Sequence, residues 1–248
     1  MPKQNQGEKD EVETIRRLIS IGTNPDHEKA ISMFGNCASE GFQVLDPDTN
    51  HVLKENEINN YKSKSLNKCD CLIRFCKDRT IIKPSIKSSN GAAYTLLNHT
   101  HNQAKCWNLL EIQNPGLKSA IDDIVKVLNR LRTDEDHGED FKLDAEFIKE
   151  HFTSDVEILK KHIGNLLKYF IYEGSGRGYS KNQADSVIVL NGKDIVYESI
   201  DCEALVDEGK LSISLRKKGM PKKLQAEHEK WTCEKYPRNG ALHIRRKK

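Results

Sequence analysis

The sequence predicts an α/β fold, α+β in detail, with a mixed sheet flanked by helices at the start and an antiparallel sheet at the end. Apolar residues recur at helical spacing over residues 117–131 and 154–172. Short apolar runs bounded by turn residues predict strands within 69–88 and again within 185–246. At 248 residues the chain can bury one large core or two smaller ones. We expect a division into residues 1–115 and 116–248.

The first predicted element is a helix within residues 3–21, where apolar side chains fall on one stripe. Acidic residues crowd its first turns, where the helix dipole favours negative charge. The simpler interpretation is helix capping and solubility. The alternative is that Glu8 or Glu11 reaches a functional site as a metal ligand.

The stretch from Lys68 to Asn98 organises the rest of the prediction. A strand at 69–75 and a second strand at 80–88 flank a turn, and we expect them to pair as a hairpin. Residues two apart on a strand face the same side, so Ser85 and Lys87 share one face and Ile86 turns into the core. The hairpin would let Asp70 approach that polar face.

A carboxylate and a lysine on neighbouring strands are ingredients of a metal-assisted phosphodiesterase. Asp70 would hold a divalent cation, and Lys87 would orient or deprotonate the attacking water and offset charge on the phosphate. The alternative is a solvated surface hairpin that happens to carry both residue types.

The amino-acid sequence of this stretch resembles that of a known protein family. Lys68-Cys69-Asp70, Ile73-Arg74-Phe75 and Ser85-Ile86-Lys87-Ser88-Ser89 resemble the catalytic core of type II restriction endonucleases of the HpaII and MspI kind, in the PD-(D/E)XK nuclease superfamily. Residues 91–98 and the acidic start of the first helix also resemble the HpaII group. The resemblance covers about the first hundred residues. The usual acid two positions before the lysine is replaced by Ser85, where some restriction enzymes carry Asn or Gln.

The resemblance implies a PD-(D/E)XK-type mixed β-sheet core and cleavage of double-stranded DNA at a short specific sequence with Mg²⁺. It implies Asp70, Ser85 and Lys87 as the catalytic set, with Ser85 at the second metal-side position through a water molecule. Metal ligands would be Asp70, the carbonyl of Ile86 and Glu11. The resemblance also implies a monomer or homodimer with a cognate DNA methyltransferase as genetic companion.

Charge is unevenly distributed along the second half. From residue 134 to 157, ten acids stand against Lys142 and Lys149, so this surface should face away from a polyanion. From Lys210 to the end, thirteen Lys and Arg stand against three Glu. This basic end, expected to include an antiparallel sheet, favours binding to a phosphate backbone.

These considerations give the DNA-binding candidates. Phosphate contacts are expected from Lys83, Lys217, Lys218, Lys222 and Lys223. The Gly-containing loop at 174–183 supplies base-edge candidates and an interleaved aromatic residue, namely Arg177, Lys181, Asn182, Gln183 and Tyr179. Candidates near the predicted active site are Ser88, Asn90, Asn98 and His99.

The seven cysteines in a chain without a secretory signal favour free thiols and a cytoplasmic location. No apolar run approaches the ~20 residues that span a bilayer. Cys69, Cys71 and Cys76 suggest a zinc site, but the sequence has no Cys-x-x-Cys, and inward-facing thiols are the favoured interpretation.

Two other functions stay open on the sequence alone. The first is a catalytically inactive, sequence-specific DNA-binding protein, in which Ser85 marks loss of the acidic set. The second is an RNA-binding or RNA-processing factor that uses the same basic surface.

Overall fold

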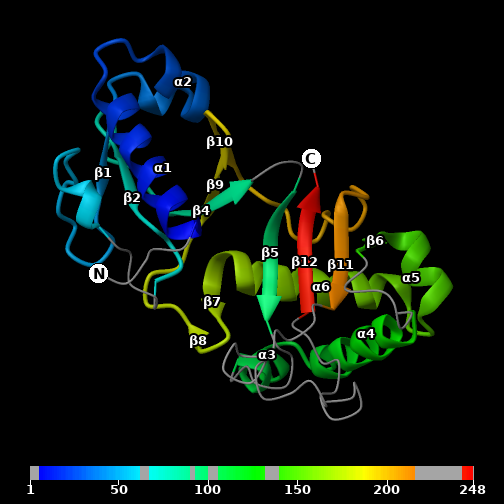
Figure 1. Ribbon diagram of the computed structural model, residues 1–248. Helices are drawn as coiled ribbons and strands as arrows, with labels where there is room; N and C mark the ends of the chain where they lie inside the picture. The colour runs from blue at the N-terminus through cyan, green and yellow to red at the C-terminus, as the bar shows by residue number, and fades with distance from the viewer. Residues whose placement is uncertain are drawn as a thin grey trace, which may run out of the picture. The chain divides into compact units, whose positions relative to one another are not determined.

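The computed structural model describes residues 6–61, 67–89, 93–99, 106–131, 140–215 and 242–247 (Figure 1). Its α-helices are α1 (Gln6–Thr23), α2 (Glu28–Phe34), α3 (Cys106–Gln113), α4 (Leu117–Leu131), α5 (Ala145–His151) and α6 (Val156–Lys168). A π-helix at Tyr169–Glu173 continues α6, and 3₁₀ turns lie at Gly35–Ala38 and Ile58–Asn60.

The strands belong to mixed and antiparallel sheets, which confirms the α+β class. In chain order they are β1 (Phe42–Leu45), β2 (Leu72–Phe75), β3 (Ile81–Ile82), β4 (Pro84–Ser89), β5 (Ala93–His99), β6 (Phe141–Leu143), β7 (Gly174–Ser175), β8 (Gly178–Tyr179), β9 (Ser186–Asn191), β10 (Asp194–Glu198), β11 (Leu211–Leu215) and β12 (Leu242–Lys247).

The chain forms two compact units, each assembled from two separate stretches. Unit 1 comprises Met1–Tyr94 and Lys168–Asp201, and unit 2 comprises Thr95–Leu167 and Cys202–Lys248. This division differs from the single boundary expected near residue 115. The chain returns to unit 1 because β9 pairs with β4, a partner about a hundred residues earlier in the sequence.

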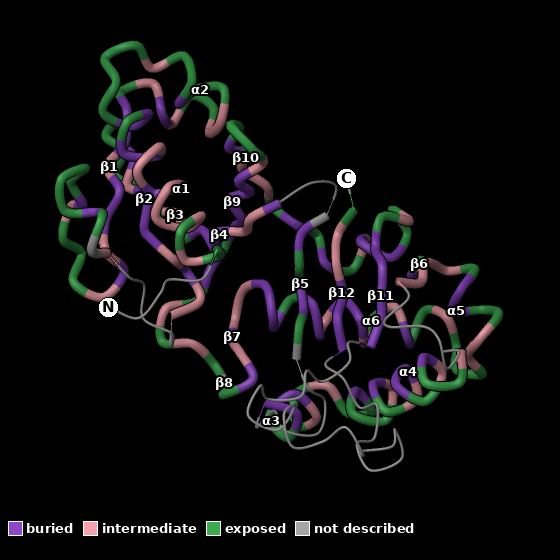
Figure 2. The backbone as a smooth tube through the Cα atoms, viewed as in Figure 1, coloured by how far each residue is buried: buried purple, intermediate pink, exposed green. Residues whose placement is uncertain are grey.

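Unit 1 contains two three-stranded sheets, in the orders β1-β2-β3 and β10-β9-β4. Strands β2 and β3 form the start of the predicted hairpin, with Ile73 opposite Ile82. Beyond Lys83 the hairpin prediction is wrong, because β4 pairs in parallel with β9, with Ile86 opposite Ile188. The continuous apolar run in β9 suits a strand that is buried on both faces (Figure 2).

Helix α1 packs against β1 and β4 (Figure 1). Ile15 and Leu18 on α1 are buried in a core shared with Phe42, Ile73 and Ile86 from the strands. The helix approaches β1 closely at its C-terminal end: a Cβ added at Gly22 would lie 2.4 Å from the Phe42 carbonyl oxygen. The shared core therefore packs α1 against β4, the strand that carries Ser85 and Lys87.

Unit 2 is built on a four-stranded sheet in the order β5-β12-β11-β6. Strand β11 pairs antiparallel with both β12 and β6, and all five of its residues are buried (Figure 2). Helix α4 contacts β11 through the apolar stripe that predicted the helix. In the described part of the chain, no helix is long and apolar enough to cross a membrane.

Candidate active site

Asp70 is fixed to the edge of β4 by its main chain and its side chain. Its backbone N–H donates to the Pro84 carbonyl at 3.0 Å, and its Oδ2 accepts from the Ile86 N–H at 2.6 Å. Tyr61 Oη donates to the Asp70 carbonyl at 2.9 Å. Burial raises the pKa of Tyr61, so its hydroxyl stays a donor. The carboxylate therefore lies beside the strand as the sequence predicted.

The polar face of β4 is also as predicted. Ser85 is buried, and its Oγ accepts a hydrogen bond from Lys87 Nζ at 3.0 Å, so both side chains lie on one face. Ile86 points the other way into the core. Burial lowers the pKa of Lys87, while the negative charges of Asp70 and Glu11 oppose that shift. A lysine and two carboxylates thus act on one another at this strand.

Helix α1 contributes the second carboxylate. The carboxylate of Glu11 acts electrostatically on Lys87. The sequence alone left open whether Glu8 or Glu11 reaches the site. The neighbouring Asp10 was not a candidate, yet its Oδ2 accepts a short hydrogen bond from Ser88 Oγ. Ser88 is thereby engaged by α1, and its role as a DNA contact stays a prediction.

Lys68 is a residue of this site that the sequence analysis did not single out. It lies two positions before Asp70 and is partly buried. The pKa of Lys68 is lowered to about 7, mainly by burial and also by the charge of Lys87, while the charge of Asp70 opposes both effects. The signal was present as the lysine that opens the Lys-Cys-Asp motif, but its role depends on tertiary packing.

Asn182 was predicted to read a base, which stays a prediction, and the structure shows that its side chain also bonds within the protein. Its Nδ2 donates to the Pro47 carbonyl at 3.0 Å, to Asp48 Oδ1 at 3.3 Å and to Asn67 Oδ1 at 3.1 Å. Its own carbonyl accepts from the N–H groups of Lys68 at 2.9 Å and Cys69 at 3.2 Å. These acceptors use both donor hydrogens of the side-chain amide. Asn182 therefore holds in place the segment that carries Lys68 and Asp70.

The other candidates of the 174–183 loop remain exposed. Strands β7 and β8 form a small hairpin, and Arg177 lies at its turn. The Tyr179 ring packs edge-on against Tyr169, with centroids 5.1 Å apart. Lys181 and Gln183 are exposed. These four residues can reach a ligand, and their roles remain predictions.

Lys83 lies between β3 and β4 in the same unit. Its N–H donates to Asp185 Oδ1 at 2.8 Å and its carbonyl accepts from the Asp185 N–H at 3.0 Å. These main-chain bonds fix the strand junction, and Lys83 is itself exposed.

The remaining DNA-binding candidates cannot be placed in the site. Asn90, Lys217, Lys218, Lys222 and Lys223 lie outside the described residues. Asn98 is exposed on β5 and belongs to unit 2, as does His99, whose side chain is not described.

Two described arginines of β12 are engaged by acids. Arg245 pairs with Asp140, and Arg246 Nη2 lies 3.2 Å from Glu208 Oε2. On the adjacent β6, Lys142 Nζ lies 2.8 Å from Asp144 Oδ2. The charges of these three residues are balanced within unit 2, and most of the basic residues that suggested a DNA-binding surface, at 216–241, lie outside the described residues.

The cysteines beside Asp70 face inward. Cys69 and Cys71 are fully buried free thiols, and burial raises the pKa of Cys69 to about 12. Among the residues that the structure describes, no group of three or more His, Cys, Asp or Glu could hold a metal ion. A metal at Asp70 would therefore need water or substrate oxygens to complete its shell.

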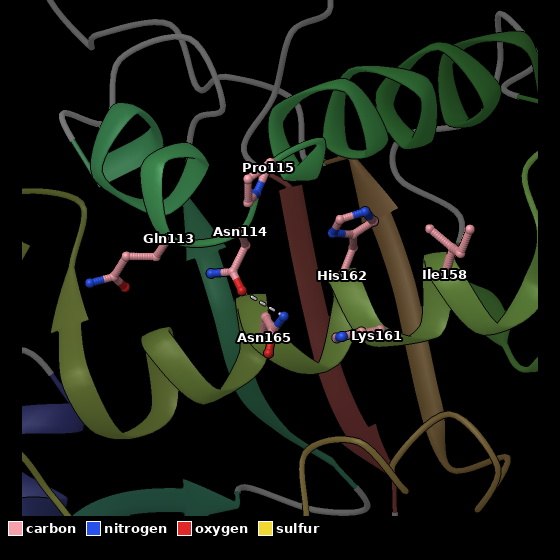
Figure 3. Close-up of a pocket in the computed structure, with 7 residues that line it drawn as sticks. All are labelled: Gln113, Asn114, Pro115, Ile158, Lys161, His162 and Asn165. Atoms are coloured by element: carbon pink, nitrogen blue, oxygen red, sulfur yellow. Dashed lines mark hydrogen bonds between the residues drawn. The ribbon is translucent and has the colours of Figure 1, made fainter.

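Unit 2 has a pocket of about 320 Å³ that the sequence did not predict (Figure 3). Asn165 Nδ2 on α6 donates to Asn114 Oδ1 at 2.7 Å across it. His162 lines the same pocket, and its buried Nδ1 makes no hydrogen bond with the described residues. Burial lowers the pKa of His162, which favours the neutral ring. The exposed Ile158 gives one wall an apolar surface.

Comparison with known proteins gives no independent assignment. No protein-family model matches the chain, and no curated protein matches it significantly. The site geometry and the resemblance of the Lys68–Asn98 stretch are therefore the basis for a functional proposal.

Proposed function

We propose that this protein is a Mg²⁺-dependent endonuclease that cleaves double-stranded DNA at a short specific sequence, as a type II restriction endonuclease of the PD-(D/E)XK superfamily. One observation carries the proposal. The Asp70 carboxylate is bonded to Ile86 on the strand whose polar face presents Ser85 and Lys87. The two segments that carry the resemblance, one with Asp70 and one with Ser85 and Lys87, thus lie together in the fold. A chance resemblance of sequence would not be expected to bring them together.

The oxygen donors at this edge fit Mg²⁺ in kind. Asp70 and Glu11 supply carboxylates, and the Ile86 carbonyl points to the same strand edge as its N–H, which faces Asp70. Mg²⁺ prefers oxygen ligands and retains several waters, so a small protein contribution suffices. When bound, Mg²⁺ would polarise the phosphoryl oxygens and make a water molecule a better nucleophile.

Lys87 would act on the water and the phosphate. Burial lowers the pKa of Lys87. A lysine with a lowered pKa gives up and takes back a proton more readily, as a general acid or base must. Its hydrogen bond to Ser85 Oγ orients the ammonium along the strand face. In the charged form it would offset the negative charge of the phosphodiester.

DNA contacts from unit 1 are available without the basic C-terminal end. Lys83, Arg177 and Lys181 are exposed cations of the same unit as Asp70. Backbone contacts of this kind provide affinity and orientation, while base reading requires side chains at the groove. Arg177 is the strongest base-reading candidate, because Arg pairs with guanine in the major groove.

The test is incubation of the pure protein with plasmid DNA, genomic DNA and RNA, with and without Mg²⁺. Discrete DNA fragments that require Mg²⁺ support the proposal. Lys87→Ala should abolish cleavage while leaving specific DNA binding largely intact. Lys29→Ala is the matched control, because Lys29 is an exposed lysine on α2 of the same unit.

The other outcomes distinguish the alternative functions. Specific DNA binding without cleavage would indicate an inactive DNA-binding protein, and cleavage of RNA alone would indicate an RNA-processing factor. Near-normal cutting by Lys87→Ala would refute the catalytic assignment of that lysine.

A further inference from the structure

Helix α6 has two different faces, and one of them lines a pocket. Ile158, Lys161, His162 and Asn165 follow the spacing i, i+3, i+4 and i+7, so they share one side of the helix. The other side holds the buried apolar residues of α6, namely Leu159, Ile163, Leu166 and Leu167. The first face forms one wall of the pocket of about 320 Å³, and the junction of α3 and α4 forms the wall across from it (Figure 3).

The junction between α3 and α4 is held in place by the protein itself. The Glu111 carboxylate accepts from the Gly116 N–H at 2.9 Å and from the Lys118 N–H at 2.8 Å. Gly116 has a φ of 91°, which favours glycine. A Cβ at this glycine would lie 3.5 Å from His162 Nε2, so the His162 ring packs against the junction. Both walls are therefore formed before a ligand binds, which lowers the entropic cost of binding.

The described lining of the pocket has donors to spare and one positive charge. Asn165 Nδ2 donates to Asn114 Oδ1 at 2.7 Å, and this bond uses one hydrogen of the pair's four. The Lys161 ammonium makes no ion pair with the described residues, and the described lining contains no carboxylate. Amide hydrogens beside an ammonium favour a ligand with a negative charge and several acceptor oxygens.

Apolar surface at the same pocket indicates that the ligand has a carbon body. Ile158 is 58% exposed, and Pro115 on the opposite wall is also exposed. Covering such side chains with an apolar group is favourable, in proportion to the area removed from water. A volume of about 320 Å³ is at the lower end of small-molecule sites, which span roughly 300–1,000 Å³. The pocket therefore suits a small organic molecule.

We propose that this pocket binds a small organic anion, with its carboxylate or phosphate group on Lys161 and the Asn114 amide and its apolar body against Ile158 and Pro115. Both anionic groups offer the oxygens that the lining can bind. The described lining residues all belong to unit 2, whereas Asp70 and Lys87 belong to unit 1. The inference therefore goes beyond the proposed function, and either can fail without the other.

The test uses benzoate and phenyl phosphate as probes of the two anionic groups. The full chain, labelled with ¹⁵N, is titrated with each at constant ionic strength and observed by NMR. At least one of them should shift the signals of residues 113–116 and 158–165 and reach saturation. Benzamide lacks the charge and acetate lacks the ring. Both should bind about fivefold or more weakly than the aromatic anion, because each loses one of the two contacts.

Variants of one lysine show whether the charge is responsible. Lys161→Met should weaken binding of the aromatic anion about fivefold, a loss limited by the solvent around an exposed ammonium. Lys161→Arg should keep most of the affinity. Lys149→Met is the matched control, because Lys149 is an exposed lysine on α5 of the same unit, and it should stay within about twofold of wild type.

Three results would overturn the inference. The first is the absence of saturable shifts at these residues with both aromatic anions. The second is equal affinity for benzamide or acetate, and the third is unchanged affinity in Lys161→Met. Duplex DNA that shifts these signals where neither small anion does would also overturn it, in favour of a backbone contact. The comparison of benzoate with benzamide on wild type decides the question even if Lys161→Met does not fold.

Discussion

Replacing Asn182 tests whether the segment before Asp70 is held by one side-chain amide. Asn182→Ala removes the donor to Pro47, Asp48 and Asn67 but keeps the backbone carbonyl that accepts from Lys68. The buried Pro47 carbonyl then loses this partner. We expect a loss of stability and a displaced Lys68–Asp70 segment.

The expected size follows from the hydrogen bonds. The amide has two donor hydrogens for three acceptors, so about two bonds form at once. A neutral bond contributes about 0.5–1.5 kcal/mol and one to a charged group such as Asp48 about 1.5–3 kcal/mol. The free energy of unfolding should therefore fall by about 2–4 kcal/mol in Asn182→Ala. Asn182→Asp should cost more, because it places a carboxylate against Asp48 and two other acceptors.

The assay is chemical denaturation of wild type, Asn182→Ala and Asn182→Asp, with Gln183→Ala as the exposed neighbour and matched control. The free energy of unfolding should be lowest for Asn182→Asp, higher for Asn182→Ala and highest for the Gln183→Ala control. A stability near wild type for Asn182→Asp would refute the argument, because a solvent-facing base reader tolerates that change. Loss of specificity without loss of stability would support the base-reading role.

Three further predictions concern the site and one helix cap. Asp70→Asn should stop cleavage with stability close to wild type, because an amide oxygen can still accept from the β4 amide, whereas Asp70→Ala should also lose about 1–3 kcal/mol in denaturation. When cleavage is measured against Mg²⁺ concentration, Ser85→Ala should lose little rate and Glu11→Gln should need more Mg²⁺. An unchanged Mg²⁺ requirement in Glu11→Gln would mean that Glu11 only caps the helix. Asp144→Ala should cost about 1 kcal/mol, because Asp144 caps α5 by accepting from the Phe147 N–H at 2.9 Å. The ion pair with Lys142 and this cap lower the pKa of Asp144 in the folded protein. Its contribution to stability is therefore present above the ordinary Asp pKa of about 3.9 and is lost as the pH falls through the lower folded-state pKa. Denaturation of wild type and Asp144→Ala from pH 7 to pH 2 should show their stability difference disappear, and a constant difference would contradict the assignment.

Local patterns predicted the elements whose signals are local. Helix α4 begins and ends where its apolar stripe does, at Leu117 and Leu131. Asn191-Gly192 is a residue pair typical of tight hairpin turns, and it joins β9 to β10 with the positive φ of 59° at Gly192 that such a turn needs. The short helices α2, α3 and α5 were missed, because about two turns of helix carry little periodicity and depend on tertiary packing.

The N-cap of α6 shows the precision that such patterns allow. Thr153 and Ser154 are N-cap residue types just before this helix, but the Asp155 carboxylate accepts from the Glu157 and Ile158 N–H groups instead. All three residue types cap helices well, so composition alone could not choose among neighbours.

The site was predictable where it depends on alternation along one strand. Ser85 and Lys87 follow from a period of two, which any strand assignment supplies. The parallel pairing of β4 with β9 joins residues 102 apart at Lys83 and Asp185, and no local pattern encodes it. The hydrogen bonds of Asn182 could not be predicted for the same reason, because its acceptors come from distant parts of the chain.

A serine at position 85, where the resembling family usually has an acid, is compatible with the charges around it. Ser85 is buried and accepts from Lys87, so an acid there would form a buried ion pair and compete with phosphate for the lysine. With a hydroxyl at this position, the negative charge near Lys87 comes from Asp70 and from Glu11 on α1. The ammonium of Lys87 is then oriented by a neutral partner. If the protein is the proposed nuclease, Ser85 would mark a redistribution of charge from strand to helix, and the Glu11→Gln titration tests that interpretation.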